Sequence, residues 1–357
     1  MIAPTTFWIC DGHQDLSLNH HRYGRDITRE LAAIRAAEHG THRPWGTATV
    51  SLPEMRNGNV GMAFVTLLAL ARLTDHPPGE CEAATPEQAH AIAMRDLDYY
   101  RRLEDAGHVR IIGDRASLDA HAAQWDSGAA DRRLGVVLLM EGAEPILAPS
   151  EAAEWRERGL RIIGPAWFGE NRYARGTGTP GGLTNLGREL LEQMVRAGLI
   201  LDVSHLAEAG CLEALDLFGG TIIASHSNAR ALVPGDRQLS DVMIRRLIRR
   251  DAVIGIALDA WMLVPGWRHG QSNANVRLAA VADHIDHVCQ LAGDAGHAAI
   301  GSDLDGGFGR EQCPADIDSI ADLPRLLEVL SDRGYPDDDI RAIAHGNWLG
   351  VLRRAWQ

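Results

Sequence analysis

The second half of the chain alternates short apolar runs with stretches of helical periodicity. The apolar runs contain almost no polar positions, so strands formed from them would be buried on both faces, as in a parallel sheet. The helical stretches between them would provide the crossovers that parallel strands need. The predicted strands are Gly135–Met140, Leu160–Gly164, Leu199–Val203, Thr221–Ala224, Ala252–Leu258 and Ala298–Gly301, and the predicted helices are residues 183–197, 206–217, 240–250, 276–292 and 323–332.

The first half adds further strands and one long helix to this pattern. Phe7–Cys10 and Gly58–Leu68 are apolar runs that predict strands, and Val109–Ile112 predicts a minor one. Thr85, followed by a proline and an acidic residue, has the features of a helix N-terminus. The polar residues 19–23, which include two histidines, predict a solvated loop.

About eight strand–helix units follow one another, and no linker, charge run or repeat divides the chain. This pattern is typical of a closed (β/α)8 barrel of the TIM type, which reaches this length as a single domain. The prediction is therefore one barrel domain over residues 1–357. An open, doubly wound sheet is the alternative.

Composition narrows the possible classes of function. Asp and Glu total 48 against 35 Lys and Arg, and the formal charge of −13 argues against a nucleic-acid or anionic-membrane partner. Five scattered cysteines without a C-x-x-C pair indicate reduced thiols rather than disulfides or thiolate zinc sites. The first six residues lack a basic region, and no apolar run approaches the length of a membrane span. We therefore expect a cytoplasmic protein.

Metal-binding side chains recur where the predicted strands end. His13 and Asp15 follow the first strand two positions apart, so both leave the same face of an extended backbone. A barrel brings the carboxyl ends of all its strands to one rim, where active sites lie. Nitrogen and oxygen donors in this number, without cysteine, suit two metal ions that share a bridging carboxylate. The six candidates are His13, Asp15, Glu141, His205, His226 and Asp303.

Short motifs surround these candidates in a definite order along nearly the whole chain. They are Asp-Gly-His-x-Asp at Asp11–Asp15, Glu-Gly at Glu141–Gly142, Asp-Val-Ser-His at Asp202–His205, Ser-His-Ser at Ser225–Ser227, Gly-x-Asp-x-Asp-Gly at Gly301–Gly306 and Gly-Asn-Trp-Leu at Gly346–Leu349. In this order they resemble the membrane (renal) dipeptidase family of the metal-dependent amidohydrolase superfamily. The resemblance implies a zinc-dependent dipeptidase with two zinc ions per chain. His13 and Asp15 would hold one ion, His205 and His226 the other, and Glu141 would bridge them.

The resemblance also implies how a dipeptide would be hydrolysed to free amino acids. A hydroxide that bridges the two ions would attack the peptide carbonyl, and Asp303 would take the proton and return it to the leaving amine. Arg237, eleven residues after His226, would bind the terminal carboxylate of the substrate. The family tolerates a D-residue on the carboxyl side, so L-Xaa-D-Xaa dipeptides are among the expected substrates. A homodimer is implied as well.

The predicted substrate pocket departs from the family pattern. Trp167 stands where many members carry a substrate-contacting histidine, so Asn171, Arg172 or Tyr173 would take over its role. Asp259 replaces a more usual aromatic and amide stretch, and it would favour a cationic group such as an α-amine or a basic side chain. These departures leave open the hydrolysis of another amide, such as an N-acyl amino acid or a lactam. A non-enzymatic, metal-stabilised binding protein is the third hypothesis.

One further pattern is set aside. Residues 176–181 match the G-x-G-x-x-G pattern of dinucleotide sites. No predicted strand immediately precedes them, and Pro180 stands where helix N–H groups would face a pyrophosphate. We therefore reject a dinucleotide site and expect a loop at the rim of the barrel.

Overall fold

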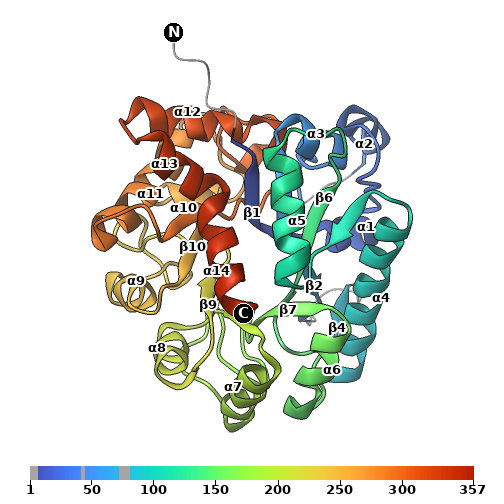
Figure 1. Cartoon of the computed structure of the whole chain (residues 1–357), viewed down its shortest axis with the longest axis vertical. Coiled ribbons are helices and arrows are strands. Elements are labelled where there is room, and N and C mark those ends of the chain that lie inside the picture. The colour runs from blue at the N-terminus through green and yellow to red at the C-terminus, as the bar shows by residue number, and fades with distance from the viewer. Residues whose placement is uncertain (1–6, 42–44, 72–80) are drawn as a thin grey trace.

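The computed structural model describes residues 7–41, 45–71 and 81–357. Residues 1–6, whose lack of a basic region entered the sequence analysis, lie outside the described residues. A sheet of parallel strands curls into a barrel, and helices surround it (Figure 1). The strands are β1 Ile9–Gln14, β2 Val60–Leu68, β3 Leu70–Ala71, β4 Glu82–Ala83, β5 Val109–Ile111, β6 Leu134–Glu141, β7 Leu160–Gly164, β8 Ile200–Asp202, β9 Ile222–Ala224, β10 Val253–Ile256 and β11 Ala298–Ile300. Neighbours in the barrel follow the order β1-β2-β6-β7-β8-β9-β10-β11, with β5 paired to β6 beside it and β3 paired to β4 in a separate small sheet.

Helices connect the strands and cover the outside of the barrel (Figure 1). They are α1 Leu16–Tyr23, α2 Leu31–Ala37, α3 Leu52–Asn57, α4 Pro86–Asp105, α5 Arg115–Asp126, α6 Ala152–Glu157, α7 Asn185–Ala197, α8 Glu208–Leu217, α9 Asp241–Ile248, α10 Ala260–Leu263, α11 Leu278–Ala292, α12 Pro324–Asp332, α13 Asp337–Arg341 and α14 Asn347–Ala355. Several begin at a side-chain cap. Thr85, Thr184 and Ser240 accept hydrogen bonds from backbone N–H groups in the first turns of α4, α7 and α9.

The strands are apolar on both faces because the barrel has an inner and an outer core. One hydrophobic cluster contains a residue from every strand of the barrel order, including Val137 and Leu139 of β6, so it fills the interior. Val136 and Leu138, which alternate with them along β6, pack in a second cluster with the surrounding helices. Trp348 reaches the interior from α14, where its indole N–H donates to the backbone carbonyl of Ile300 at 2.9 Å.

Side chains and backbone together close the barrel between β1 and β11. Ser302, just after β11, donates its backbone N–H to Asp11 Oδ1 at 2.7 Å and its hydroxyl to Asp11 Oδ2 at 2.5 Å. The backbone N–H of Asp303 then donates to the carbonyl of His13 at 3.3 Å. The predicted (β/α)8 barrel is thereby confirmed, and the alternative of an open sheet is wrong.

Most of the predicted elements are found in the structure, and a difference concerns a short helix that was expected to be a loop. The predicted strands are all present, and the five helices predicted in the second half correspond to α7, α8, α9, α11 and α12. Residues 19–23, predicted as a solvated loop, instead form the end of α1. The side chains of Leu16 and Leu18 are buried, and the ring of His20 stacks on Tyr99 at a centroid distance of 4.5 Å. These contacts come from distant parts of the chain, so the local polarity was misleading.

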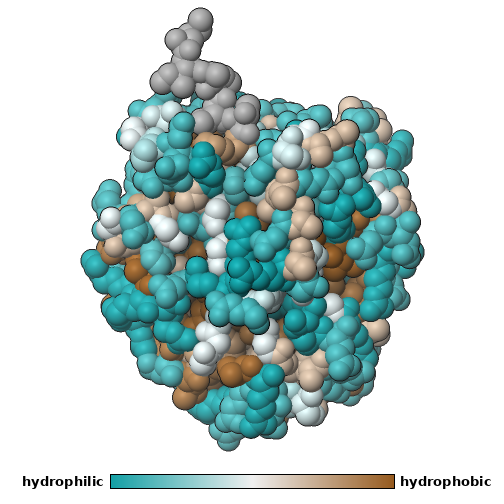
Figure 2. Space-filling model, in the orientation of Figure 1, coloured by the Kyte–Doolittle hydropathy of each residue, from teal (hydrophilic) through white to brown (hydrophobic). Residues whose placement is uncertain are grey.

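The surface seen in Figure 2 is mostly hydrophilic, with hydrophobic residues scattered among polar ones, as on most solvent-exposed protein surfaces. Within residues 7–41, 45–71 and 81–357, none of the helices has both the length and the hydrophobicity needed to cross a bilayer.

Three glycines surround the backbone carbonyl of Ser225, where the strands of the barrel approach one another. A Cβ atom on Gly12, Gly255 or Gly301 would overlap the carbonyl oxygen of Ser225. Glycine therefore allows β1, β10 and the residue after β11 to pack directly against the end of β9.

Replacing Gly301 by alanine forces a methyl group into this contact. We expect the free energy of unfolding to fall by about 3 kcal/mol, the upper part of the usual range for overpacking, as measured by denaturant unfolding. Gly350→Ala is the matched control, because a Cβ there meets only Arg354 Nη1, at 3.5 Å, and alanine favours a helix. Equal stability of the two variants would contradict the argument.

Candidate metal centre

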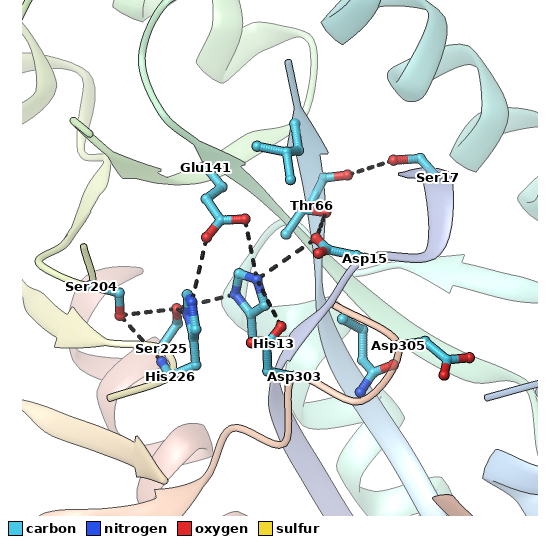
Figure 3. A network of polar contacts seen from close by, with 12 residues as sticks. His13, Asp15, Ser17, Thr66, Glu141, Ser204, Ser225, His226, Asp303 and Asp305 are labelled. Atoms are coloured by element: carbon cyan, nitrogen blue, oxygen red, sulfur yellow. Dashed lines mark hydrogen bonds and ion pairs between the residues drawn. The ribbon is translucent and has the colours of Figure 1, made fainter. Parts of the chain in front are cut away.

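The predicted donors gather at the carboxyl end of the barrel, where Glu141 lies between two groups of side chains (Figure 3). Glu141 Oε2 is 3.4 Å from His13 Nε2. Glu141 Oε1 is 3.1 Å from His205 Nε2 and 3.4 Å from His226 Nε2. Each oxygen of this carboxylate therefore faces a different set of imidazoles.

Two more carboxylates surround His13. Its Nε2 atom lies 3.7 Å from Asp15 Oδ1 and 3.9 Å from Asp303 Oδ1. The ligand atoms of His13, Asp15 and Asp303 lie within 4.8 Å of one another, and so do those of His13, Glu141 and His226. These two groups share His13 and include donors from both sides of Glu141.

The donor atoms fit metal ions better than they fit one another. His13 Nε2 is buried and has no hydrogen-bond partner among the described residues. His205 Nε2 and His226 Nε2 are 3.0 Å apart, and two imidazole nitrogens at this distance need a proton or a cation between them. Neutral imidazoles and carboxylates are common ligands of zinc and of related divalent ions.

A serine–aspartate pair orients one histidine on each side of Glu141. Ser225 Oγ donates to Asp202 Oδ2 at 2.5 Å. Because its only proton is used there, the same oxygen accepts from the Nδ1–H groups of His226, at 2.8 Å, and of His13, at 3.3 Å. Both rings are thus held with Nδ1–H toward Ser225 and with Nε2 pointing into the centre, where its lone pair is available once that atom carries no proton.

Two threonines contact other candidate ligands. Thr66 Oγ1 donates to Asp15 Oδ1 at 2.5 Å, and Thr177 Oγ1 lies 3.1 Å from His205 Nδ1. Thr177 belongs to the segment 176–181, which sequence analysis expected to be a loop at the rim. Its contact with a distant histidine was not predicted, because no local signal links the two residues.

The backbone is strained at two residues of the centre. His205 and Asp303 have φ values of 65° and 58°, in the left-handed region, and this conformation costs a residue with a Cβ roughly 1–2 kcal/mol.

A buried ion pair holds the loop after Asp303 in place. Arg25 Nη1 lies 3.2 Å from Asp305 Oδ2, and Asp305 also accepts a hydrogen bond from the backbone N–H of Thr49 at 2.8 Å. Sequence analysis missed Arg25, which lies outside every motif.

Burial and neighbouring charges shift the pKa values of the centre. Burial lowers the pKa of His13, but the neighbouring carboxylates, Glu141 first, raise it more, to about 10. Burial, assisted by the charge of Arg237, lowers the pKa of His205 to about 4. Burial raises the pKa of Asp303 well above its usual range. The chain by itself therefore keeps a proton on His13, which a metal ion must displace.

A cavity of about 350 Å³ opens onto this centre. Its wall includes three residues that were predicted to contact the substrate, Arg237, Asp259 and Trp167. It also includes aromatic and polar side chains that sequence analysis did not name, among them Tyr23, Phe168, Trp261 and Gln312. Tyr23 ends α1, Trp261 lies in α10, and none of the four belongs to a motif.

Tyr173 lies in the outer core rather than in the wall of this cavity, which corrects the prediction that it contacts the substrate. Its side chain is buried, and its hydroxyl donates to the carbonyl of Ile146 at 2.5 Å. Asn171 and Arg172 likewise donate to backbone carbonyls of neighbouring loops. These three side chains stabilise the loop after β7 instead of facing the cavity.

Comparison with known proteins identifies the family. The family model described as membrane dipeptidase (Peptidase family M19) matches residues 4–357. The chain belongs to the membrane dipeptidase family.

Relatives and solved structures agree with this assignment. A Klebsiella pneumoniae protein described as an uncharacterized protein in the pqqA 5' region is 30% identical, over 68% of this chain and 90% of its own length. Dipeptidase aclJ of Aspergillus oryzae is 26% identical, over 85% of this chain and 69% of its own length. The crystal structure of a metallo peptidase from Rhodobacter sphaeroides, liganded with a phosphinate mimic of the dipeptide L-Ala-D-Ala, gives a TM-score of 0.79. It is 27% identical, and the match covers 98% of this chain and 100% of that one.

Membership of the membrane dipeptidase family makes the chain a metal-dependent peptide hydrolase. The family, the barrel fold and the enzyme class predicted from the sequence are thereby confirmed. The donors at the carboxyl end of the barrel are the side chains of this structure that suit the metal such a peptidase needs.

Replacing Ser225 by alanine removes the acceptor shared by His13 and His226, so neither ring keeps its tautomer. We expect metal affinity to fall roughly 10–100-fold, as measured by titration against a competing chelator. Ser127→Ala, which removes an exposed hydroxyl just after α5, is the control. Unchanged affinity in folded Ser225→Ala protein would rule out the orienting role.

Metal binding should release the proton of His13. Because the pKa of this imidazole is about 10 and a metal ion binds the neutral form, this group makes affinity rise about tenfold per pH unit below that value. Calorimetry at neutral pH in two buffers of different ionisation enthalpy counts the released protons. A binding enthalpy that is the same in both buffers would show that His13 is already neutral.

Proposed function

We propose that this chain is a two-zinc dipeptidase that hydrolyses dipeptides to free amino acids. The observation that carries the proposal is the position of Glu141, whose oxygens face His13 on one side and the pair His205 and His226 on the other. A carboxylate between two sets of donors suits two ions that share it as a ligand. Nitrogen and oxygen donors without thiolates leave such ions Lewis-acidic, and zinc suits this set.

The proposed ligand set is the one that the sequence predicted. His13 and Asp15 would hold one zinc ion, His205 and His226 would hold the other, and Glu141 would contact both. When bound, the ions would supply an activated water and would polarise the scissile carbonyl. The protein side chains would transfer the proton to the leaving amine and hold the substrate.

Asp303 is proposed to move the proton. Its side chain is 14% exposed and lines the cavity, so substrate can reach the carboxyl group while most water is excluded. Burial raises the pKa of Asp303, which favours its role in accepting the proton and returning it to the leaving amine.

Arg237 is proposed to hold the terminal carboxylate of the substrate. Its guanidinium donates to the carbonyl of His226 at 2.6 Å and to Ser227 Oγ at 3.1 Å, so its place beside a metal ligand is set by the backbone. Two of its five N–H groups serve these bonds, and the others remain for a carboxylate.

The cavity of about 350 Å³ is at the small end of ligand pockets, which suits a dipeptide better than a longer peptide.

The Rhodobacter sphaeroides relative, which was crystallised with a mimic of L-Ala-D-Ala, supports including substrates with a D-residue on the carboxyl side.

Trp167, at the cavity wall, would occupy part of the space beside His205, because their ring centroids are 6.4 Å apart. The homodimer and the cytoplasmic location stay predictions.

Replacing Glu141 by glutamine removes the shared anionic ligand. We expect the release of amino acids from dipeptides by zinc-loaded protein to fall more than about a hundredfold, together with a lower zinc content. Glu192→Gln, at an exposed position of α7, is the matched control. Full activity in Glu141→Gln protein would exclude the bridging role.

The substrates in this assay separate a dipeptidase from another amide hydrolase. The panel combines basic, acidic and apolar first residues with L- and D-second residues, and it includes N-acetylated versions. Turnover of free dipeptides only is the expected result. Equal turnover of N-acetylated compounds would favour an N-acyl amino acid hydrolase, and no release from any dipeptide, with zinc bound, would overturn the proposed substrate.

A further inference from the structure

Asp259 adds to the substrate cavity a carboxylate that is not one of the proposed metal ligands. It follows β10 and caps the short helix α10 by accepting a hydrogen bond from the backbone N–H of Trp261 at 3.3 Å. The residue is 5% exposed, and it lines the same cavity as Arg237 and Asp303. A carboxylate in this position has little water to solvate its charge.

The side chain that hydrogen-bonds to Asp259 is polar but uncharged. Gln312 Nε2 donates to its two oxygens, at 2.8 and 3.0 Å. The amide of Gln312 is itself oriented, because its Oε1 accepts a hydrogen bond from His269 Nδ1 at 2.8 Å. Within the described part of the chain, no arginine or histidine forms an ion pair with Asp259. The carboxylate is thus fixed in place by hydrogen bonds and not by a direct ion pair with another described residue.

This arrangement is costly for the charged form. Burial raises the pKa of Asp259 to about 7, even though hydrogen bonds from Gln312 and Trp261 and the charge of Arg237 lower it. A cation that enters the cavity and contacts this carboxylate would offset the lost hydration. The substrate is the molecule that occupies this cavity, so it can supply that cation.

We propose that Asp259 binds a cationic group of the substrate, so that the enzyme selects dipeptides by an ammonium or guanidinium group. The proposal rests on the dipeptidase function proposed above and adds the substrate class. The cation could be the α-amine of the first residue or a basic side chain. Both sources offer N–H donors and a positive charge to the same oxygens.

A second cavity adjoins the substrate cavity at Gln312, the hydrogen-bond partner of Asp259. This second cavity has a volume of about 580 Å³, and Phe308 also lines both cavities. Trp45 and Trp267 line this second cavity, and aromatic faces of this kind attract organic cations. A lysyl or arginyl side chain that passes Asp259 would therefore continue into a second favourable surface.

Asp259→Asn separates this role from the helix cap. Asparagine has nearly the same shape, caps helices as well as aspartate does, and can still accept hydrogen bonds from Gln312 and Trp261. It lacks the charge and one of the two acceptor oxygens that Gln312 contacts. A purely structural role therefore predicts no change in substrate preference in this variant.

The test compares substrates that differ only in the cation. Lysine dipeptides are paired with norleucine dipeptides in either position, and L-Ala-D-Ala is paired with propionyl-D-Ala, which lacks the α-amine. In metal-loaded wild-type protein, we expect at least one of these pairs to differ about tenfold or more in kcat/KM. In Asp259→Asn protein that ratio should fall to near one, and the pair that responds identifies the source of the cation. Asp332→Asn, at an exposed position of α12, is the control.

A binding measurement tests the role of Asp259 independently of turnover. The same compounds are titrated by calorimetry into Asp303→Asn protein, with and without Asp259→Asn. Loss of the preference for the cationic compounds in the double variant supports the proposal even if the dipeptidase assay fails. Unchanged ratios in both measurements would overturn it, and hydrolysis of dipeptides without any cation preference would do so while leaving the proposed function intact.

Discussion

The rest of the site depends on the buried carboxylate of Glu141 and on the positive charge that must accompany it. An isolated carboxylate in such a position would cost several kcal/mol, and Asp15 and Asp303 lie close enough to add to that cost. The imidazoles compensate only in part, because burial lowers the pKa of His205 and His226, whereas that of His13 is raised. A proton on His13 or bound metal ions must supply the missing charge. This need links the acid–base behaviour of the centre to its chemistry.

The barrel keeps this charged cluster rigid by using side chains in place of sheet hydrogen bonds. Asp11 on β1 accepts from the backbone N–H of Ser302, just after β11, and Asp202 on β8 accepts from the backbone N–H of Ser225, just after β9. Each aspartate thus binds a backbone N–H group that lies just after the end of the adjacent strand of the barrel. The ligands that follow these residues are held at defined separations. Pre-positioned donors of this kind lose little entropy when a metal ion binds.

The donors could be predicted because each follows an apolar strand whose end is visible in the local pattern. His13, Glu141 and His226 needed only that placement and the rule that the strand ends of a barrel meet at one rim. Tyr173 shows where this reasoning fails. It lies on the same loop as the cavity residues Trp167 and Phe168, yet its ring turns into the outer core and its hydroxyl binds the carbonyl of Ile146. Proximity along a loop does not indicate the direction of a side chain.

By itself the sequence predicted the barrel and the candidate metal donors, because these follow from periodicity, strand ends and residue type, and the resemblance to the family pointed to Asp259. The tertiary structure decided which groups support them. Thr177 contacts His205, Arg25 holds Asp305, and Gln312 fixes Asp259, and each pair is far apart in the chain. Such contacts arise only when the loops of different strands meet above a closed barrel. The physical reason is that hydrogen bonding and ion pairing depend on distances of about 3 Å, which no local pattern records.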